Sequence, residues 1–245
     1  MIRMTKLILA IKNPKLFARK IFGGIPRFYR LYISKDKFTI NVRRFKKDDA
    51  KLALRIDYPS LNNNSIVFDV GGYEGDFAHK INAKYGCKVY IFEPHPKFYA
   101  KCKERFKNNQ NIIILNYGLS NTNGKFKLTD SVDASSFYNL DEKNTLNCEL
   151  KNIFDVLSEM KIDDIDLMKI NIEGGEYPLL QNIADKNKLH IVKHYQIQFH
   201  DFIDDASNKR NKILSSLRKT HYNTWCYEFV WENWAIKTHI KNKSL

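Results

Sequence analysis

Three glycines and an aspartate at the end of an apolar run are the residues of this chain best suited to chemistry. The run Ile66–Val70 contains Asp69 and leads directly into Gly71, Gly72 and Gly75. A strand that ends in such a turn lets backbone amides approach a bound ligand closely, because glycine has no side chain in the way. We therefore expect a ligand to bind at this turn.

A second acidic residue, Glu93, ends the next apolar run, Val89–Phe92, and is followed by Pro94. Neighbouring parallel strands end at the same edge of a sheet, so Glu93 is expected beside the glycine turn. A carboxylate at the tip of the neighbouring strand is where nucleotide-binding folds hold a ribose diol. The two segments together predict a site for a nucleoside-containing cofactor.

The spacing of the glycines indicates the kind of cofactor. Dinucleotide-binding folds use G-x-G-x-x-G, whose backbone packs against a pyrophosphate. Here Tyr73 stands where the middle glycine would be, and the pattern is D-x-G-G-x-x-G. This pattern resembles motif I of the class I S-adenosylmethionine-dependent methyltransferases, whose cofactor has no pyrophosphate. For the glycines alone, an ordinary turn that packs a strand against a helix stays open.

Candidate proton acceptors follow two later strands. His200 and Asp201 come directly after the predicted strand 194–199, at the edge where open α/β sheets bind ligands. Histidine is neutral near physiological pH and can accept a proton there. Glu173, at the tip of the preceding strand, is the second candidate, whereas Glu176 is expected to cap the start of a helix.

Alternating strand and helix patterns from about residue 65 predict the scaffold that positions these groups. Such alternation is typical of a parallel sheet with helices on both faces. Strands are expected at 66–70, 88–92, 111–115, 125–128, 166–172 and 194–199, and helices at 76–84, 97–106, 153–160, 177–183 and 208–219. The segments 225–231 and 234–238, with Glu232-Asn233 between them, predict a closing antiparallel hairpin. The predicted fold class is α/β, a Rossmann-like, mostly parallel doubly wound sheet with a C-terminal antiparallel hairpin.

Positive charge is concentrated at the N-terminus. The chain of 245 residues has a net charge of +14, and residues 1–47 contain fourteen Lys and Arg but one acidic residue. We therefore expect a basic N-terminal arm over 1–47 and a methyltransferase domain over 48–245. Segments 4–11 and 14–23 are expected to form basic amphipathic helices, and 38–42 a strand. The arm either contacts an anionic partner such as a membrane surface or packs on the body or on a second subunit.

The remaining composition limits the class of protein. The four cysteines show no C-x-x-C spacing, which argues for reduced thiols in the cytoplasm and against a structural zinc site. No apolar run approaches the ~20 residues that span a bilayer. The nearly neutral domain lacks the basic groove of a nucleic-acid enzyme, so no nucleic-acid partner is predicted. Oligomeric state is left open.

Three segments together resemble the FkbM family of methyltransferases. They are FDVGGYEG at 68–75, FEP at 92–94 and MKINIEGGE at 168–176. The pair Ser135-Ser136 and the segment QIQFHDF at 196–202 resemble further stretches of that family, and the resemblance covers roughly residues 60–205.

The resemblance implies an O-methyltransferase that uses S-adenosylmethionine and acts on a hydroxyl of a carbohydrate or secondary metabolite. A nucleotide-linked sugar or a bacterial surface glycan such as capsule or lipooligosaccharide is the expected acceptor. The cofactor-binding residues it implies are Asp69, Gly71, Gly72, Gly75, Glu93 and Pro94, with His95 also near the adenosine and with Asn116 and Tyr117 near the adenine.

One position departs from the family. The family usually has aspartate in the K-I-D-x-E-G segment, where this chain has Asn171. An amide orients a hydroxyl but does not take its proton, so the catalytic set would be His200, Asp201, Glu173 and Asn171. The same four side chains offer oxygen and nitrogen ligands for a divalent metal. Nothing in their spacing requires one, so no metal is predicted.

Two other classes of function stay open. A nucleotide-sugar oxidoreductase or epimerase would also bind a nucleoside cofactor, but the single Y-x-x-x-K, from Tyr99 to Lys103, lies on the wrong helix for it. A scaffold that binds the cofactor without catalysis is kept open by Asn171.

Overall fold

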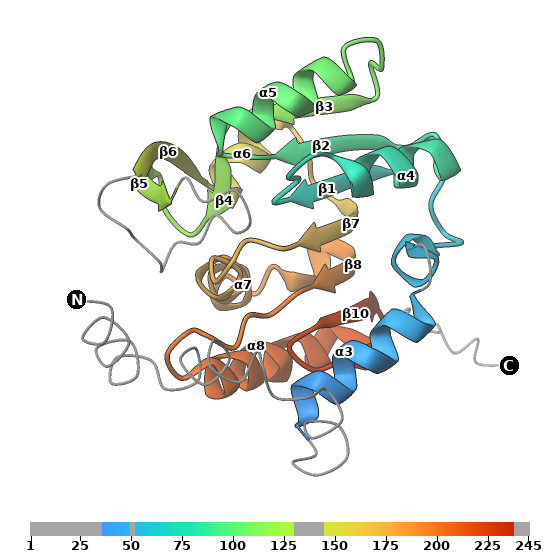
Figure 1. Cartoon of the computed structure of the whole chain (residues 1–245), viewed down its shortest axis with the longest axis vertical. Helices are drawn as coiled ribbons and strands as arrows, with labels where there is room; N and C mark the ends of the chain where they lie inside the picture. Colours follow the sequence, from blue (N-terminus) through green and yellow to red (C-terminus); the bar gives the residue numbers. More distant parts are fainter. Residues whose placement is uncertain (1–35, 50–51, 130–144, 238–245) are drawn as a thin grey trace, which may run out of the picture.

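A seven-stranded sheet forms the centre of the protein in the computed structural model, which describes residues 36–49, 52–129 and 145–237. The strand order is β3-β2-β1-β7-β8-β10-β9, and Figure 1 shows the strands from β3 to β10 stacked in this order. Their bounds are β1 Ile66–Val70, β2 Lys88–Phe92, β3 Ile112–Leu115, β7 Ile165–Ile170, β8 Val192–Ile197, β9 His221–Tyr227 and β10 Trp231–Ile236. The order reverses on either side of β1, so β1 and β7 lie where open α/β sheets bind ligands.

The pairing confirms the predicted fold class. Strands β3, β2, β1, β7 and β8 pair in parallel, and β10 pairs antiparallel with both β8 and β9. The helices that connect and flank them are α3 Lys37–Asp48, α4 Asp76–Tyr85, α5 Pro96–Arg105, α6 Ile153–Met160, α7 Glu176–Asp185 and α8 Ala206–Thr220, with 3-10 turns η4 Leu54–Ile56 and η5 Leu189–Ile191.

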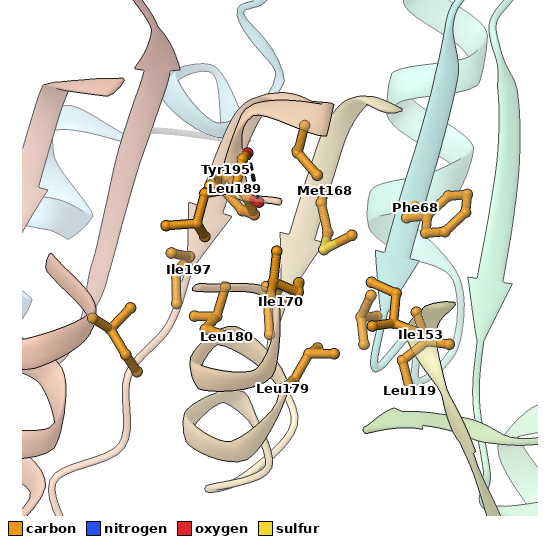
Figure 2. Packing of buried hydrophobic residues seen from close by; sticks show 14 of the residues in the cluster. Phe68, Leu119, Ile153, Met168, Ile170, Leu179, Leu180, Leu189, Tyr195 and Ile197 are labelled. Carbon is orange, nitrogen blue, oxygen red and sulfur yellow. Dashed lines mark hydrogen bonds between the residues drawn. The ribbon is translucent and has the colours of Figure 1, made fainter. Parts of the chain in front are cut away.

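The strands bury side chains on both faces of the sheet, as continuous apolar runs predict. On one face Phe68, Met168 and Ile170 pack with α6, α7 and α8, and Figure 2 shows Leu179 and Leu180 of α7 against this face. On the other face Val67 and Leu167 belong to the cluster that α4 and α5 cover. Successive residues of one strand therefore face opposite layers.

A second, three-stranded sheet was only partly predicted. It has the order β4-β6-β5, with bounds β4 Gly118–Ser120, β5 Gly124–Thr129 and β6 Thr145–Asn152. The strand expected at 125–128 corresponds to β5, whereas β4 and β6 were not predicted. Strand β4 has three residues, and β6 contains Asn147 and Asn152, so neither shows a clear apolar pattern.

The prediction of a strand at 38–42 is wrong, because this segment lies in helix α3. The side chain of Asp36 caps the helix by accepting from the backbone N–H of Thr39 at 3.0 Å. Phe38, Val42 and Phe45 recur at helical spacing and pack with Tyr227, Val230 and Trp231 of the hairpin. Phe38 and Val42 fit the alternation of a strand, but they are four residues apart and therefore also fit one face of a helix.

The C-terminal hairpin is confirmed, but its turn lies at residues 228–230 and not at Glu232-Asn233. Both polar residues are buried in β10 with partners: Glu232 accepts from Arg210 Nε at 2.8 Å, and Asn233 accepts from the hydroxyl of Tyr58 at 2.7 Å. Polar residues resembled a turn because their buried partners lie far away in the sequence.

The remaining predictions concern the N-terminal part, one serine pair and membrane-spanning helices. The helices expected at 4–11 and 14–23, and the pair Ser135-Ser136, lie outside the described residues. The division of the chain after residue 47 stays a prediction, although α3, which spans that boundary, packs on the hairpin. Among the helices that the structure describes, none has the length and apolar character needed to cross a membrane.

Candidate functional site

Gly71 and Gly72 bring the backbone of the turn after β1 against its neighbours. Gly71 has a φ of +81°, and a Cβ atom there would lie 2.1 Å from the backbone oxygen of Asn171. At Gly72 a Cβ atom would lie 2.2 Å from Cγ2 of Ile91. Neither position has room for a side chain, so the turn keeps its backbone bare.

Gly75 lies at a tightly packed position between the glycine turn and α4. It lies at the start of α4 with a φ of +79°, and a Cβ atom there would lie 2.5 Å from the ring of Phe106. This contact packs the start of α4 against the end of α5; Gly75 does not line the cavity described below, and its contact with a cofactor stays a prediction.

Asp69 forms a buried ion pair with Lys169. The two residues are register partners on β1 and β7 and, by strand alternation, point to the same face of the sheet. Lys169 Nζ donates to Asp69 Oδ1 at 2.8 Å and to the backbone oxygen of Gly71 at 2.7 Å. Burial raises the pKa of the Asp69 carboxyl, while Lys169 opposes that effect. Asp69 thus acts from beneath the turn, and Lys169 reaches the cavity.

Glu93 lies at the tip of β2 with its carboxylate held by two backbone amides. Its Oε2 accepts from Tyr73 N at 2.7 Å, and its Oε1 accepts from His95 N at 2.9 Å. Burial raises the pKa of Glu93 to about 7, although these two hydrogen bonds oppose the effect. Each carboxylate oxygen has a second lone pair, so Glu93 can accept further hydrogen bonds from a ligand.

The loops that follow β2 and β3 contain the other predicted cofactor contacts. Pro94 lines the cavity. Asn116 donates from Nδ2 to the backbone oxygens of Glu93 and Pro94 at 3.0 and 3.2 Å, so it braces this loop. Tyr117 packs on Phe92, and neither Asn116 nor Tyr117 lines the cavity. Their contact with an adenine stays a prediction.

A cavity of about 430 Å³ lies at this edge of the sheet. Its walls come from the glycine turn, the Glu93 loop, the small sheet, the end of β7 and the start of β10. Its lining includes Gly71, Gly72, Glu93, Lys169, Asn171, Glu173, Arg55 and Trp231. The predicted cofactor and catalytic segments therefore share one cavity.

Asn171 and Glu173 follow β7 and both line the cavity. Asn171 Oδ1 is buried and has no hydrogen-bond partner among the described residues. Glu173 is partly exposed and has a φ of +48°, a left-handed conformation that is unusual for glutamate. Such strain at a cavity wall is typical of functional positions.

His200 lies behind Glu173, outside the cavity wall, between two glutamates. Its Nδ1 is 3.1 Å from Glu176 Oε1, and its Nε2 is 3.5 Å from Glu173 Oε1, an ion-pair contact longer than a good hydrogen bond. Burial alone would lower the pKa of His200, but the two glutamates outweigh it and raise the pKa to about 9. A pKa in this range favours the protonated imidazole at neutral pH, whereas the sequence predicts a neutral one, and the catalytic role of His200 stays a prediction.

Glu176 has the structural role that the sequence predicts. Its side chain is fully buried, and it accepts from the backbone N–H of Gly174 at 2.8 Å and of His200 at 2.9 Å. Asp201 follows His200 and is half-buried, but it does not line the cavity. Of the four predicted catalytic residues, Asn171 and Glu173 are thus at the cavity, and His200 supports Glu173.

Sequence reasoning did not place two charged cavity residues, Lys169 and Arg55, at the site. Lys169 stands in the MKINIEGGE segment, and its register with Asp69 becomes visible once β1 and β7 are placed side by side. Arg55 comes from a segment before the motifs, and nothing in its local sequence indicates the site.

One protein family matches most of this region. The sequence model of the family described as "Methyltransferase FkbM domain" matches residues 69–223. A search of curated proteins found no match.

Solved structures with a similar fold include three methyltransferase-related chains. The fibrillarin/Nop5p complex aligns with a TM-score of 0.47 and 12% identity over 78% of this chain and 81% of that chain. An rRNA methylase from Streptococcus thermophilus gives 0.45 and 14% over 73% and 90%. The N-methyltransferase NodS from Bradyrhizobium japonicum, in complex with S-adenosyl-L-homocysteine, gives 0.41 and 10% over 83% and 100%.

Proposed function

Because this chain belongs to the FkbM family of methyltransferases, we propose that it transfers a methyl group from its cofactor, S-adenosylmethionine, to a hydroxyl group of a carbohydrate. The observation that carries the choice of a hydroxyl is the position of Glu173. Its carboxylate lines the same cavity as Gly71 and Glu93, so a proton acceptor and the cofactor-binding residues face one space.

The residues present fit the cofactor. Glu93 is a buried carboxylate with free lone pairs at the tip of β2, which suits the two ribose hydroxyls. Gly71 and Gly72 leave the turn bare where a Cβ atom would collide with neighbouring atoms. When bound, S-adenosylmethionine supplies an electrophilic methyl group.

Proton removal from the acceptor is assigned to Glu173. A sugar hydroxyl is a poor nucleophile, so a carboxylate within reach of it favours transfer. The protonated His200, 3.5 Å from Glu173 Oε1, orients this carboxylate and stabilises its charge. Asn171 Oδ1 has no hydrogen-bond partner among the described residues and is available to orient a hydroxyl. His200 thus acts as a positioning residue.

The carbohydrate assignment is supported by the side chains that line the cavity beyond the glycine turn. Trp231 supplies an aromatic ring, and Asn171 and Glu173 supply polar groups to the same cavity. An aromatic face with polar groups beside it suits a ring that carries hydroxyls.

The first test is calorimetric titration of S-adenosylhomocysteine into the wild type and into Glu93→Ala. We expect micromolar affinity for the wild type, on the order of −8 kcal/mol, and a loss of at least about tenfold in the variant. Glu74→Ala is the matched control, because Glu74 lies in the same glycine-rich turn but pairs with Lys101 and does not line the cavity. Absence of binding to the folded wild type, with NAD or a sugar nucleotide binding instead, would favour an oxidoreductase.

The second test is an acceptor screen by mass spectrometry with sugars and sugar nucleotides. On an acceptor that is methylated, Glu173→Gln should reduce turnover by about 100-fold and leave the affinity for S-adenosylhomocysteine unchanged. Methylation only of amines, or unchanged turnover in the variant, would refute the assignment of Glu173 to a hydroxyl proton.

A further inference from the structure

The cavity has a second charged wall, remote from the glycine turn. Arg55 and Trp231 line it together. The guanidinium carbon of Arg55 lies 5.3 Å from the ring centroid of Trp231 and 5.4 Å from that of Phe45, so the planar group lies against two aromatic rings. Stacked arginine of this kind is common where anions are bound.

Asp49 holds the inner edge of this guanidinium. Its buried carboxylate accepts from Arg55 Nε at 2.5 Å and from the backbone N–H of Arg55 at 3.0 Å. The two terminal nitrogens of Arg55 donate to none of the residues that the structure describes. A guanidinium carries five N–H donors, so its outer edge keeps the fork that fits a phosphate or carboxylate.

The backbone of Arg55 is tied to the sheet. Its carbonyl oxygen accepts from Nε2 of Gln196, a fully buried residue of β8, at 2.8 Å. The same nitrogen donates to the hydroxyl of Tyr58, which in turn donates to Asn233 of β10. Arg55 is therefore prepared for a ligand before one binds, which reduces the entropy lost on binding.

The order of strands separates this wall from the cofactor end. Glu93 ends β2, on one side of β1, whereas Trp231 begins β10, three strands from β1 on the other side. Since neighbouring strands lie about 4.8 Å apart, β10 is about 14 Å from β1 and about 19 Å from β2. Glu173 follows β7, between the two ends. The Arg55 wall thus lies on the far side of the proton acceptor from the ribose carboxylate.

The other cation that lines the cavity among the described residues, Lys169, already has a close acidic partner. Lys169 is bound to Asp69 and to the backbone oxygen of Gly71. Arg105 pairs with Asp76 at the opposite end. The outer edge of Arg55 is the positive group of the far wall that keeps donors for a ligand.

We propose that Arg55, stacked on Trp231, forms an acceptor subsite for a phosphate ester, so that the sugar to be methylated carries a phosphate. This inference rests on the proposed function, because it places the acceptor beside Glu173. The phosphate either links the sugar to a nucleotide or esterifies the sugar itself. Both present the same tetrahedral oxyanion to the guanidinium.

The experiment is calorimetry on the full chain saturated with S-adenosylhomocysteine. The probes are UDP-glucose, glucose 6-phosphate, inorganic phosphate and neutral methyl glucoside. We expect saturable binding of at least one phosphorylated sugar, tighter than methyl glucoside, and a loss of about tenfold to a hundredfold in Arg55→Gln. Preference for UDP-glucose or for glucose 6-phosphate identifies the source of the phosphate.

Three further variants keep the test decisive. Arg55→Gln leaves buried Asp49 without its cation, so Asp49→Asn/Arg55→Gln is the folded alternative with no unpaired charge. Arg55→Lys keeps the charge but loses the fork, and should retain part of the affinity. Arg218→Gln is the matched control, since Arg218 also lies over a tryptophan, Trp234 at 5.9 Å, but outside this cavity.

The possible results separate failure of the phosphate subsite from failure of the proposed function. If S-adenosylhomocysteine binds the wild type but no phosphorylated probe binds at millimolar concentration, the subsite is refuted while the proposed function stands. If the Arg55 variants lose S-adenosylhomocysteine itself, Arg55 contacts the cofactor, and the proposal is wrong. If S-adenosylhomocysteine fails to bind the folded wild type, the proposed function fails first.

Discussion

The charged His200 should make the stability of this protein depend on pH. Burial disfavours its protonated form, but the carboxylates of Glu173 and Glu176 outweigh burial and raise the pKa from 6.5 to about 9. A pKa raised in the folded state stabilises the fold fully below about pH 6.5. That stabilisation is lost as the pH rises through about 9. The difference corresponds to about 3 kcal/mol.

The perturbation is His200→Gln, which keeps an amide donor for Glu176 but removes the titrating charge. Urea unfolding would be measured from about pH 6 to about pH 10, with an NMR titration of the imidazole of the wild type. We expect the wild type to lose about 3 kcal/mol of unfolding free energy relative to the variant across this range, with the imidazole titrating near pH 9. His79→Gln, which removes an exposed histidine of α4, is the control.

Two results would refute this reasoning. An imidazole that titrates near 6.5 would mean that the glutamates do not hold the charge in solution. Parallel pH profiles of wild type and His200→Gln would mean that another group causes the dependence. In either case the role of His200 as a charged residue that positions the carboxylate of Glu173 would be wrong.

Two more predictions concern the cofactor end of the cavity. A ribose diol needs the ionised form of Glu93, whose pKa is raised to about 7. The affinity for S-adenosylhomocysteine should therefore fall about tenfold from pH 8 to pH 6. A calorimetric affinity that does not change with pH would exclude Glu93 as the acceptor of the ribose hydroxyls. Gly71→Ala should cost about 3 kcal/mol in urea unfolding, because its φ is +81° and its Cβ atom would meet Asn171 O at 2.1 Å. Gly124→Ala, where a Cβ atom meets nothing within 4 Å, is the control, and equal losses in the two variants would refute the steric argument.

Much of the sheet was predictable because its strands are continuous apolar runs bounded by strong signals. Predicted strands 66–70 and 88–92 agree with β1 and β2, since Gly71 and Pro94 end these runs clearly. Helix 153–160 agrees with α6, which Asn152 caps by accepting from Phe154 N. Local chemistry decided these elements.

The errors have a common physical cause, which is that the deciding partner lies far away in the sequence. Glu232 stays in a strand because Arg210 neutralises it, and Asn233 because Tyr58 reaches it across 175 residues. Segment 38–42 is helical because Phe45 completes an apolar face that docks on the hairpin. Arg55 is likewise placed at the cavity by residues far away in the sequence, Gln196 and Trp231.

The charges of the site explain why these distant contacts matter for function. Buried ions are stable only when paired, and three pairs meet around one cavity: Asp69 with Lys169, His200 with Glu176, and Arg55 with Asp49. In each pair the carboxylate, from Asp69, Glu176 or Asp49, lies away from the cavity wall and contacts the protein itself. The groups at the cavity wall that keep unused hydrogen-bonding capacity include Glu93, Asn171, Glu173 and the outer edge of Arg55. They follow the sheet edge in the order of β2, β7 and β10, which is the order that a ribose, a reacting hydroxyl and a phosphate on the acceptor would require.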